Sequence, residues 1–298
     1  EDERWVIKAL WSSLIAFIPI FIIAYRFRHW RLGGRLSLAI LIQVSITTLV
    51  VAWNLPKEYY YSITDFSVLI ALLMGMMLTS AVLMIYGIEF SEVMFKGKWR
   101  RNFSRLPALP ADKEPLVSIH LACYNEPPEM VIATIKSLAK LRYTNYEVIV
   151  VDNNTSDEAK WKPVEAYMAN LPSHFKFFHL PTWPGFKAGA LNFALSKTNP
   201  SAEVVGIVDA DYEVTTDWLT DLIPHFIEPN VAVVQAPQAH REWQHNFFRR
   251  MSNWEFEGFF KIGMHHRHER NALIQHGTMT LVRHQALIKS GAWSEWCI

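Results

Sequence analysis

Long apolar runs without a single charged residue dominate the first third of the chain. They cover residues 9–25, 36–56 and 66–88. A helix needs about 20 apolar residues to cross a bilayer. The first run reaches that length, as 5–25, if Lys8 extends its ammonium to the head groups. The alternative, three buried helices of a soluble bundle, requires polar faces at helical spacing, and these runs are apolar all round. We therefore predict three transmembrane helices.

Basic residues flank these runs on one side of the predicted membrane. Four arginines separate the first two runs, five Lys or Arg residues follow the third, and neither group contains an acidic residue: Arg26, Arg28, Arg31, Arg35, and Lys96, Lys98, Arg100, Arg101, Arg105. Cytoplasmic loops carry an excess of Lys and Arg. We therefore predict a multi-pass protein of the inner (plasma) membrane, embedded in the lipid bilayer, with everything after Phe90 in the cytoplasm.

After residue 115 the pattern changes to short apolar runs separated by stretches of helical periodicity. The runs cover residues 116–122, 146–151, 175–180, 203–208 and 231–235. Continuous apolar strands alternating with helices are typical of an α/β fold whose mostly parallel sheet is covered on both faces. We predict transmembrane helices in 1–91, a basic cytoplasmic linker in 92–114, and an α/β domain in 115–298.

An aromatic stripe at helical spacing runs from Trp243 to Ile262. Such a stripe usually marks a helix that packs into a core. The alternative is an amphipathic helix lying at the membrane interface.

Composition and charge exclude several classes of protein. The chain of 298 residues is 51% hydrophobic and 19% charged, with a formal net charge of +1. A disordered chain is therefore excluded, and no basic field indicates a nucleic-acid partner. Two cysteines are too few for a disulfide framework or a cysteine zinc site, and Cys123 is expected to be buried. The glycines form neither a dinucleotide fingerprint nor a P-loop.

Polar residues follow three of the predicted strands where each strand ends. Tyr124 and Glu126 follow the first, Asp152 the second, and Asp209 and Asp211 the fourth. Ligands of parallel sheets bind beyond the carboxyl ends of the strands. Carboxylates gathered there repel one another unless a cation or a hydrogen-bonding ligand compensates them. The Asp-x-Asp pair suits Mg²⁺ or Mn²⁺, which prefer oxygen ligands and leave positions open for diphosphate oxygens.

Six segments resemble, in order and spacing, the family 2 inverting glycosyltransferases with a GT-A fold. The segments are Ser118 to Glu126 (SIHLACYNE), Val150 to Asn154 (VVDNN), Phe186 to Asn192 (FKAGALN), Val208 to Asp211 (VDAD), Val234 to Pro237 (VQAP) and Gln275 to Thr278 (QHGT). Within that family the chain is similar to the processive membrane synthases of the cellulose-synthase-like group, above all to bacterial membrane β-(1→3)-glucan synthases. The resemblance covers residues 115–298. It implies transfer of glucose from UDP-glucose, a UDP-sugar donor, to a growing β-glucan acceptor.

The resemblance also implies a role for each matching residue on the donor side. Tyr124, Glu126 and Asp152 would hold the uracil and ribose. Asp209 and Asp211 would bind Mg²⁺ or Mn²⁺, with Asp209 also near the donor.

The remaining matches concern the sugar and the acceptor. Lys187 would contact the diphosphate or the sugar, and Gln235 and the segment His276-Gly277-Thr278 would line the donor and acceptor pocket. The general base of the family is the Asp of a Thr-Glu-Asp motif, which we expect beyond Ile298. Two alternatives remain: a non-processive UDP-sugar transferase acting on a lipid carrier, and a non-catalytic membrane subunit that binds nucleotide sugars.

Overall fold

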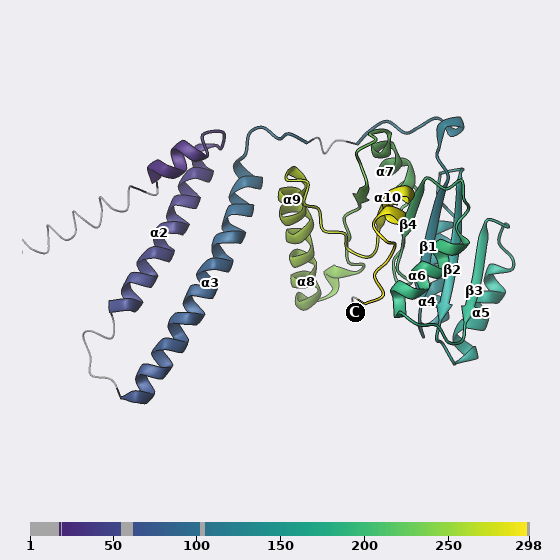
Figure 1. Cartoon of the computed structure of the whole chain (residues 1–298), viewed down its shortest axis with the longest axis horizontal. Coiled ribbons are helices and arrows are strands. Elements are labelled where there is room, and N and C mark those ends of the chain that lie inside the picture. Colours follow the sequence, from purple (N-terminus) through teal and green to yellow (C-terminus); the bar gives the residue numbers. More distant parts are fainter. Residues whose placement is uncertain (1–17, 19, 55–61, 102–104, 297–298) are drawn as a thin grey trace, which may run out of the picture. The chain divides into compact units, whose positions relative to one another are not determined.

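The chain folds into two compact units. The computed structural model describes residue 18 and residues 20–54, 62–101 and 105–296 (Figure 1). One unit contains helices α2 (Leu32–Asn54) and α3 (Ile63–Phe95) together with residues Ala239–Ile274. The other contains the residues on either side of Ala239–Ile274 that build a six-stranded sheet. The predicted domain boundaries stay predictions, and no sequence pattern indicated that Ala239–Ile274 folds with the helices.

Helix α3 is the one described helix that is long and apolar enough to cross a membrane. It has 33 residues and a mean hydropathy of 2.5 in its most apolar window, none of which is buried. A capping box starts the helix: Ser62 Oγ accepts from the Asp65 N–H at 3.2 Å, and the Asp65 carboxylate accepts from the Ser62 N–H at 2.9 Å. These bonds satisfy N–H groups that have no partner in the first helical turn.

The other two predicted spans are not established by the structure. Helix α2 includes most of the predicted span 36–56. Its apolar stretch among the described side chains is Leu32–Thr47, and the side chains of residues 48, 49 and 51–54 lie outside the description. Of the predicted span 5–25, residues 20–25 are helical, and residues 5–17 and 19 lie outside the described residues. The three-span architecture therefore stays a prediction.

Helices α2 and α3 pack against each other through small and aliphatic residues. Leu38 and Ala39 are buried, and Ile88 of α3 packs against the same cluster. Gly87 permits this close approach, because a Cβ atom there would lie 2.1 Å from Cδ2 of Leu41.

The sheet combines parallel and antiparallel strands. Its strands are β1 (Val117–Cys123), β2 (Tyr146–Asn153), β3 (Phe175–Leu180), β4 (Val204–Ile207), β5 (Val233–Gln235) and β6 (Thr280–Arg283). They lie in the order β3-β2-β1-β4-β6-β5. The pairs β1–β2, β2–β3 and β1–β4 are parallel, whereas β6 runs antiparallel to both β4 and β5. The prediction of an α/β, mostly parallel sheet is confirmed.

Helices cover both faces of this sheet. The helical elements of this unit are η2 (Ala111–Lys113), α4 (Pro128–Leu138), α5 (Glu158–Met168), α6 (Phe186–Lys197), α7 (Trp218–Leu222), η3 (Ile223–Ile227) and α10 (His284–Lys289). Alternate residues of β2 face opposite sides, so Val148 packs with Ile135 of α4, and Ile149 packs with Ala190 of α6. Each fully buried Val or Ile side chain stabilises the fold by about 1.5 to 3 kcal/mol.

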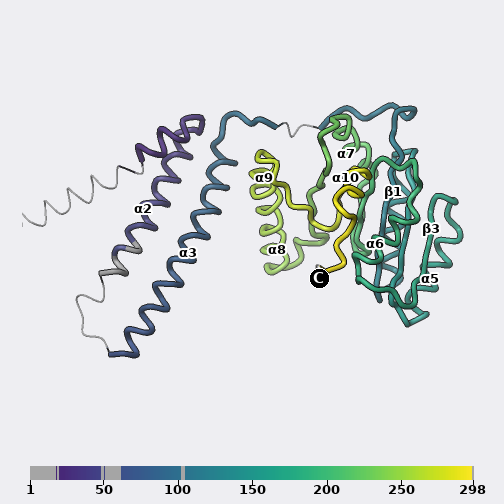
Figure 2. The backbone as a smooth tube through the Cα atoms, in the orientation of Figure 1, coloured from purple at the N-terminus to yellow at the C-terminus, as the bar shows by residue number. Residues whose placement is uncertain are grey.

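Strand β6 is absent from the sequence-based prediction. Its four residues, TLVR, form no apolar run of their own, and the strand depends on pairing with β4 and β5. Residues Ala239–Ile274, which belong to the other unit, separate β5 from β6 in the sequence. The C-terminal segment, yellow in Figure 2, belongs to the sheet unit again.

The aromatic stripe lies within Ala239–Ile274. It forms η4 (Trp243–His245), α8 (Phe247–Gly258), the π-helical turn η5 (Phe259–Met264) and α9 (His265–Glu269). Phe247, Phe248, Met251 and Trp254 are all more than half exposed in the described chain. The expectation that the whole stripe is core is therefore wrong for this face of α8, and its place at a membrane interface stays a prediction.

Candidate active site at the sheet edge

Strand register brings the residues after β1 beside those of β2. Cys123, the last residue of β1, pairs with Asp152, and Asp152 pairs in turn with His179 of β3. Asp152 is only 4% exposed, whereas Tyr124 is 59% exposed just beyond it. Cys123 is a buried free thiol, as expected, and burial raises its pKa well above the ordinary value. It is therefore a packing residue rather than a nucleophile.

The loop after β1 is held in a defined turn. Asn125 adopts a positive φ of 61°, its N–H donates to Thr155 Oγ1 at 2.9 Å, and its carbonyl accepts from Lys160 Nζ at 2.7 Å. The Glu126 carboxylate accepts from the Tyr124 N–H, which folds the loop back on itself. These bonds fix Tyr124 and Glu126 at the edge of the sheet.

An aromatic pair lies beside Asp152. The Trp161 indole stacks on the His179 imidazole with ring centroids 4.0 Å apart and an angle of 11° between the planes. His179 Nδ1 lies 3.6 Å from Asp152 Oδ1. Burial raises the pKa of Asp152, and Thr155 and His179 partly offset that effect. Neither Trp161 nor His179 lies in a motif that could have indicated this contact from the sequence.

Three separate segments meet at Asp209, just after β4. Its carboxylate pairs with the Lys187 ammonium, and its backbone N–H donates to Thr278 Oγ1 at 2.9 Å. Lys187 Nζ also donates to the Gly277 carbonyl at 3.0 Å. A positive φ of 77° at Gly277 favours glycine at this position. Lys187, Asp209, Gly277 and Thr278 therefore form one hydrogen-bonded group.

Local backbone geometry at the start of α6 positions Lys187. Gly185 precedes the helix in the left-handed region, with φ 79°. Gly189 lies against the preceding turn so closely that a Cβ atom would be 1.9 Å from the Pro184 carbonyl oxygen. The Trp183 Nε1–H donates to the Gly189 carbonyl at 3.0 Å. These contacts explain why glycine occupies positions 185 and 189, and they place Lys187 in the first turn of α6.

Gln235 joins the end of β5 to the segment that precedes β6. Its Oε1 accepts from the His276 N–H at 3.1 Å and from the Thr280 hydroxyl, and its Nε2 donates to the Thr278 carbonyl at 3.0 Å. Gln235 therefore fixes the backbone of the 276–278 segment, and this segment in turn binds Lys187 and Asp209.

The electrostatics of the site arise from four carboxylates. Burial raises the pKa of Asp209, the Lys187 ammonium opposes that effect, and the Asp211 carboxylate adds to it. Burial likewise raises the pKa of Glu126, with Asp152 and Asp211 contributing further repulsion. The structure thus gathers Glu126, Asp152, Asp209 and Asp211 on one sheet edge. Such a group favours a cation or a donor-rich ligand.

The residues fit a divalent ion that is shared with a phosphorylated ligand. No set of three His, Cys, Asp or Glu residues that could hold a metal ion occurs in the described chain, so a fully protein-made cage is not formed there. Mg²⁺ typically uses one or two carboxylates, completed by substrate phosphates and water. Asp209 and Asp211 offer that number of carboxylates.

A further contact, not anticipated from the sequence, lies near the end of the described chain. Asn192 of α6 donates through Nδ2 to the Trp293 carbonyl at 2.9 Å and to Glu295 Oε1 at 2.7 Å. A Cβ atom at Gly185 would lie 2.8 Å from Glu295 Oε2. Residues 293–295 are therefore held over the start of the helix that carries Lys187.

Comparison with known proteins places the sequence motifs in one family. The model of "Glycosyl transferase family 2" matches residues 118–291, more than half of the chain. The beta-monoglucosyldiacylglycerol synthase of Trichormus variabilis is 33% identical over 191 residues, which cover 61% of this chain and 38% of that protein. The probable glucomannan 4-beta-mannosyltransferase 2 of Oryza sativa subsp. japonica is 26% identical over 189 residues, covering 61% of this chain and 32% of that protein.

A solved structure shares the fold. The mannosyltransferase PcManGT from Pyrobaculum calidifontis, in complex with GDP-Man and Mn²⁺, aligns with a TM-score of 0.54 at 20% identity, covering 72% of this chain and 55% of that one. This likeness supports the GT-A-like arrangement of the mixed sheet. The chain spans less than two fifths of the length of the curated relatives named above.

Proposed function

Since the chain belongs to glycosyl transferase family 2, we propose that it transfers glucose from UDP-glucose to a growing β-glucan, with inversion at the anomeric carbon. The observation that carries the proposal is the group of four carboxylates at the sheet edge, joined to Lys187 and to the 276–278 segment. Carboxylates that repel one another favour a metal ion and hydroxyl donors, and a lysine favours a diphosphate. A nucleotide sugar with a metal-bound diphosphate carries all of these groups.

Each residue has a role in binding the donor. Asp152, nearly buried beside the stacked Trp161 and His179, accepts a hydrogen bond from the nucleoside. Tyr124 is exposed and offers a ring face to the uracil, and Glu126 accepts from the ribose hydroxyls.

Lys187 and the metal ligands act at the diphosphate. As the acceptor hydroxyl forms the new glycosidic bond, the bond between the anomeric carbon and the diphosphate oxygen breaks. The departing UDP gains negative charge, and the Lys187 ammonium stabilises that charge. Asp209 and Asp211 would hold a divalent cation, Mg²⁺ or Mn²⁺, which neutralises diphosphate charge when bound. Gln235 and His276-Gly277-Thr278 form the wall against which the sugar and the acceptor are oriented.

The unit that contains α3 anchors the enzyme. The helix is long, apolar and uncovered in the described structure, which supports attachment to a bilayer. The basic residues that follow it support a cytoplasmic catalytic domain in a multi-pass inner-membrane protein.

The test uses membranes that contain the full-length protein. They are incubated with Mg²⁺ and, separately, UDP-glucose, UDP-galactose, UDP-N-acetylglucosamine and GDP-mannose, and product linkage is determined by methylation analysis. We expect a β-linked glucan from UDP-glucose alone, and none from the Asp209→Asn variant. Incorporation from GDP-mannose but not from UDP-glucose would overturn the donor assignment.

A second candidate acceptor is a membrane lipid. It is favoured by the 33% identity to a protein named beta-monoglucosyldiacylglycerol synthase. In this case UDP-glucose yields a product carrying one sugar, which partitions into chloroform and does not lengthen with time. A non-catalytic subunit, the third alternative, would bind the nucleotide sugar and give neither product.

A further inference from the structure

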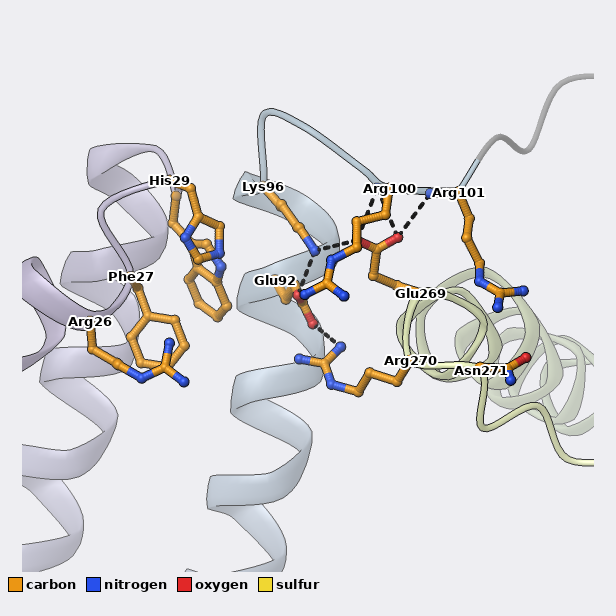
Figure 3. Close-up of a pocket in the computed structure, with 11 residues that line it drawn as sticks. Arg26, Phe27, His29, Glu92, Lys96, Arg100, Arg101, Glu269, Arg270 and Asn271 are labelled. Atoms are coloured by element: carbon orange, nitrogen blue, oxygen red, sulfur yellow. Dashed lines mark hydrogen bonds and ion pairs between the residues drawn. The ribbon is translucent and has the colours of Figure 1, made fainter.

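A cavity of about 560 Å³ lies in the unit that contains α3, apart from the residues assigned to sugar transfer. Five of its lining residues are basic, namely Arg26, Lys96, Arg100, Arg101 and Arg270. Arg26 precedes α2; Lys96, Arg100 and Arg101 follow α3; and Arg270 follows α9 (Figure 3).

The two glutamates of the cavity wall are already satisfied by some of these cations. Glu92 pairs with Lys96 at 3.0 Å and with Arg270. Glu269 accepts from Lys96 Nζ at 2.9 Å and from the backbone N–H groups of Arg100 and Arg101 at 3.0 and 3.2 Å (Figure 3). Lys96 and Arg270 are therefore compensated within the protein, and the backbone at 100–101 is fixed to α9.

Three arginines remain uncompensated. Within the described residues, the guanidinium groups of Arg26, Arg100 and Arg101 form no salt bridge with a carboxylate. Arg26 instead stacks on the Phe27 ring, with Cζ 5.8 Å from the centroid. All three arginines line the same cavity, and like charges around one cavity repel unless an anion compensates them. The planar guanidinium matches phosphate in a bidentate geometry, which a lysine does not provide.

A buried donor in the same wall also lacks an acceptor. Trp30 lines the cavity and is 2% exposed, and its Nε1–H has no hydrogen-bond partner in the described structure. Buried side-chain donors are nearly always paired in folded proteins. An oxygen of a ligand in the cavity would supply the acceptor.

The source of the anion follows from the helix that forms one wall. Glu92 lies in the last turn of α3 and Lys96 directly follows the helix. The apolar residues that precede Glu92 within about two turns, including Ile85, Tyr86 and Phe90, are about half to two thirds exposed. A molecule with a phosphate and two acyl chains satisfies both surfaces at once, whereas free phosphate satisfies only the cavity. We propose that this cavity binds the phosphate head group of an anionic phospholipid, whose chains lie along the exposed face of α3.

The test measures lipid binding directly, so it does not depend on transferase activity. The full chain, purified in detergent, is titrated with phosphatidylglycerol, and retained lipid is counted by native mass spectrometry. The test variant is Arg26→Ala/Arg100→Ala/Arg101→Ala, which removes the three uncompensated guanidinium groups and leaves the backbone bonds to Glu269 in place. The matched control is Arg28→Ala/Arg31→Ala/Lys98→Ala, which removes the same charge from exposed residues of the same segments that do not line the cavity.

The expected result is one tightly retained phosphatidylglycerol, with binding at least about tenfold weaker in the test variant and within about twofold of wild type in the control. Phosphatidylcholine, whose head group has no net charge, should bind at least about tenfold more weakly. Equal losses in the two variants would show that general attraction to basic residues suffices, and would overturn the site. Displacement of the lipid by an equal concentration of inorganic phosphate would overturn the lipid as the source of the anion.

Discussion

The ammonium group of Lys187 donates to the carboxylate of Asp209, although the two residues lie in different elements, the start of α6 and the loop after β4. The pair joins the motif at 186–192 to the motif at 208–211. Lys187 Nζ also donates to the Gly277 carbonyl at 3.0 Å, which links both motifs to the one at 275–278. The ammonium therefore lies within the group of residues that we propose binds the diphosphate.

Replacing Lys187 with Ala should lower kcat/KM for the nucleotide sugar by about 10²-fold, because a preorganised positive charge is lost at the leaving group. The measurement is initial rate against donor concentration in membranes. Lys197→Ala removes the same charge from the far end of α6 and should leave the rate unchanged. Equal activity of the Lys187 variant and wild type would remove this lysine from the mechanism.

Binding of UDP should require a divalent cation. Titration calorimetry of the purified chain with UDP should give measurable affinity with Mg²⁺ or Mn²⁺ and none in EDTA. Asp209→Ala and Asp211→Ala should each abolish the metal-dependent component, because each removes one of the two proposed carboxylate ligands. Asp112→Asn, an exposed carboxylate outside the site, serves as control. Undiminished affinity for UDP in EDTA would contradict the metal assignment.

Stability of the sheet unit should fall on mild acidification because of His120 in β1. Its Nε2 contacts Thr198 Oγ1 at 2.8 Å in a fully buried setting. Burial, reinforced by His284, lowers the pKa of His120 from 6.5 to about 3. Between pH 6.5 and about pH 3 the unfolded chain therefore binds a proton at His120 that the folded chain does not. The free energy of unfolding decreases as pH falls below 6.5, by about 1.4 kcal/mol per pH unit.

Urea unfolding of the full chain at several values from pH 7 to pH 5 tests this prediction. The His120→Gln variant should show a shallower pH dependence, whatever its stability at pH 7. His245→Gln, at an exposed position, should keep the wild-type slope. An unchanged slope in His120→Gln would assign the acid sensitivity to other groups.

Glu269 should stabilise the helical unit down to low pH. Burial opposes ionisation, but the N–H groups of Arg100 and Arg101 and the Lys96 ammonium prevail and lower the pKa of Glu269 from 4.5 to about 2. The stabilisation is therefore complete above pH 4.5 and is lost as pH falls toward 2. Glu269→Gln should cost about 1 to 3 kcal/mol at pH 7. Thermal unfolding of this variant is compared with that of Glu255→Gln, an exposed carboxylate on α8, which should match wild type.

The sheet unit should face the cytoplasm. A cysteine introduced at the exposed Lys140 should resist a membrane-impermeant maleimide in intact cells and react after permeabilisation, with the unsubstituted chain as background. Labelling in intact cells would reverse the orientation inferred from the basic segments.

Much of the sheet could be predicted from sequence because its strands are continuous apolar runs. Residues such as Ile119 and Val150 are fully buried, so the pattern itself records their burial. The carboxylates after β1, β2 and β4 could be placed on one edge because parallel strands end together. Their roles in donor binding remain predictions.

Other parts of the site depend on contacts that leave no local pattern. Strand β6 has no apolar run, and the stack of Trp161 on His179 joins residues from a helix and a strand. The backbone N–H groups of Arg100 and Arg101 donate to the Glu269 carboxylate across about 170 positions in sequence. Neither hydropathy nor residue spacing indicates such a long-range contact.

The place of β6 between β4 and β5 has a consequence for synthesis on the ribosome. Strands β1 to β4 can pair as soon as they emerge, but β5 borders only β6 in the described sheet, and residues Ala239–Ile274 between β5 and β6 fold with the other unit. Until residues 280–283 emerge, β4 has an unpaired edge and β5 has no neighbour. The Gln235 amide has no partner at Thr280 before then, so nascent chains that stall earlier carry the clustered carboxylates after β1, β2 and β4 without the hydrogen bonds that fix the 276–278 segment beside them.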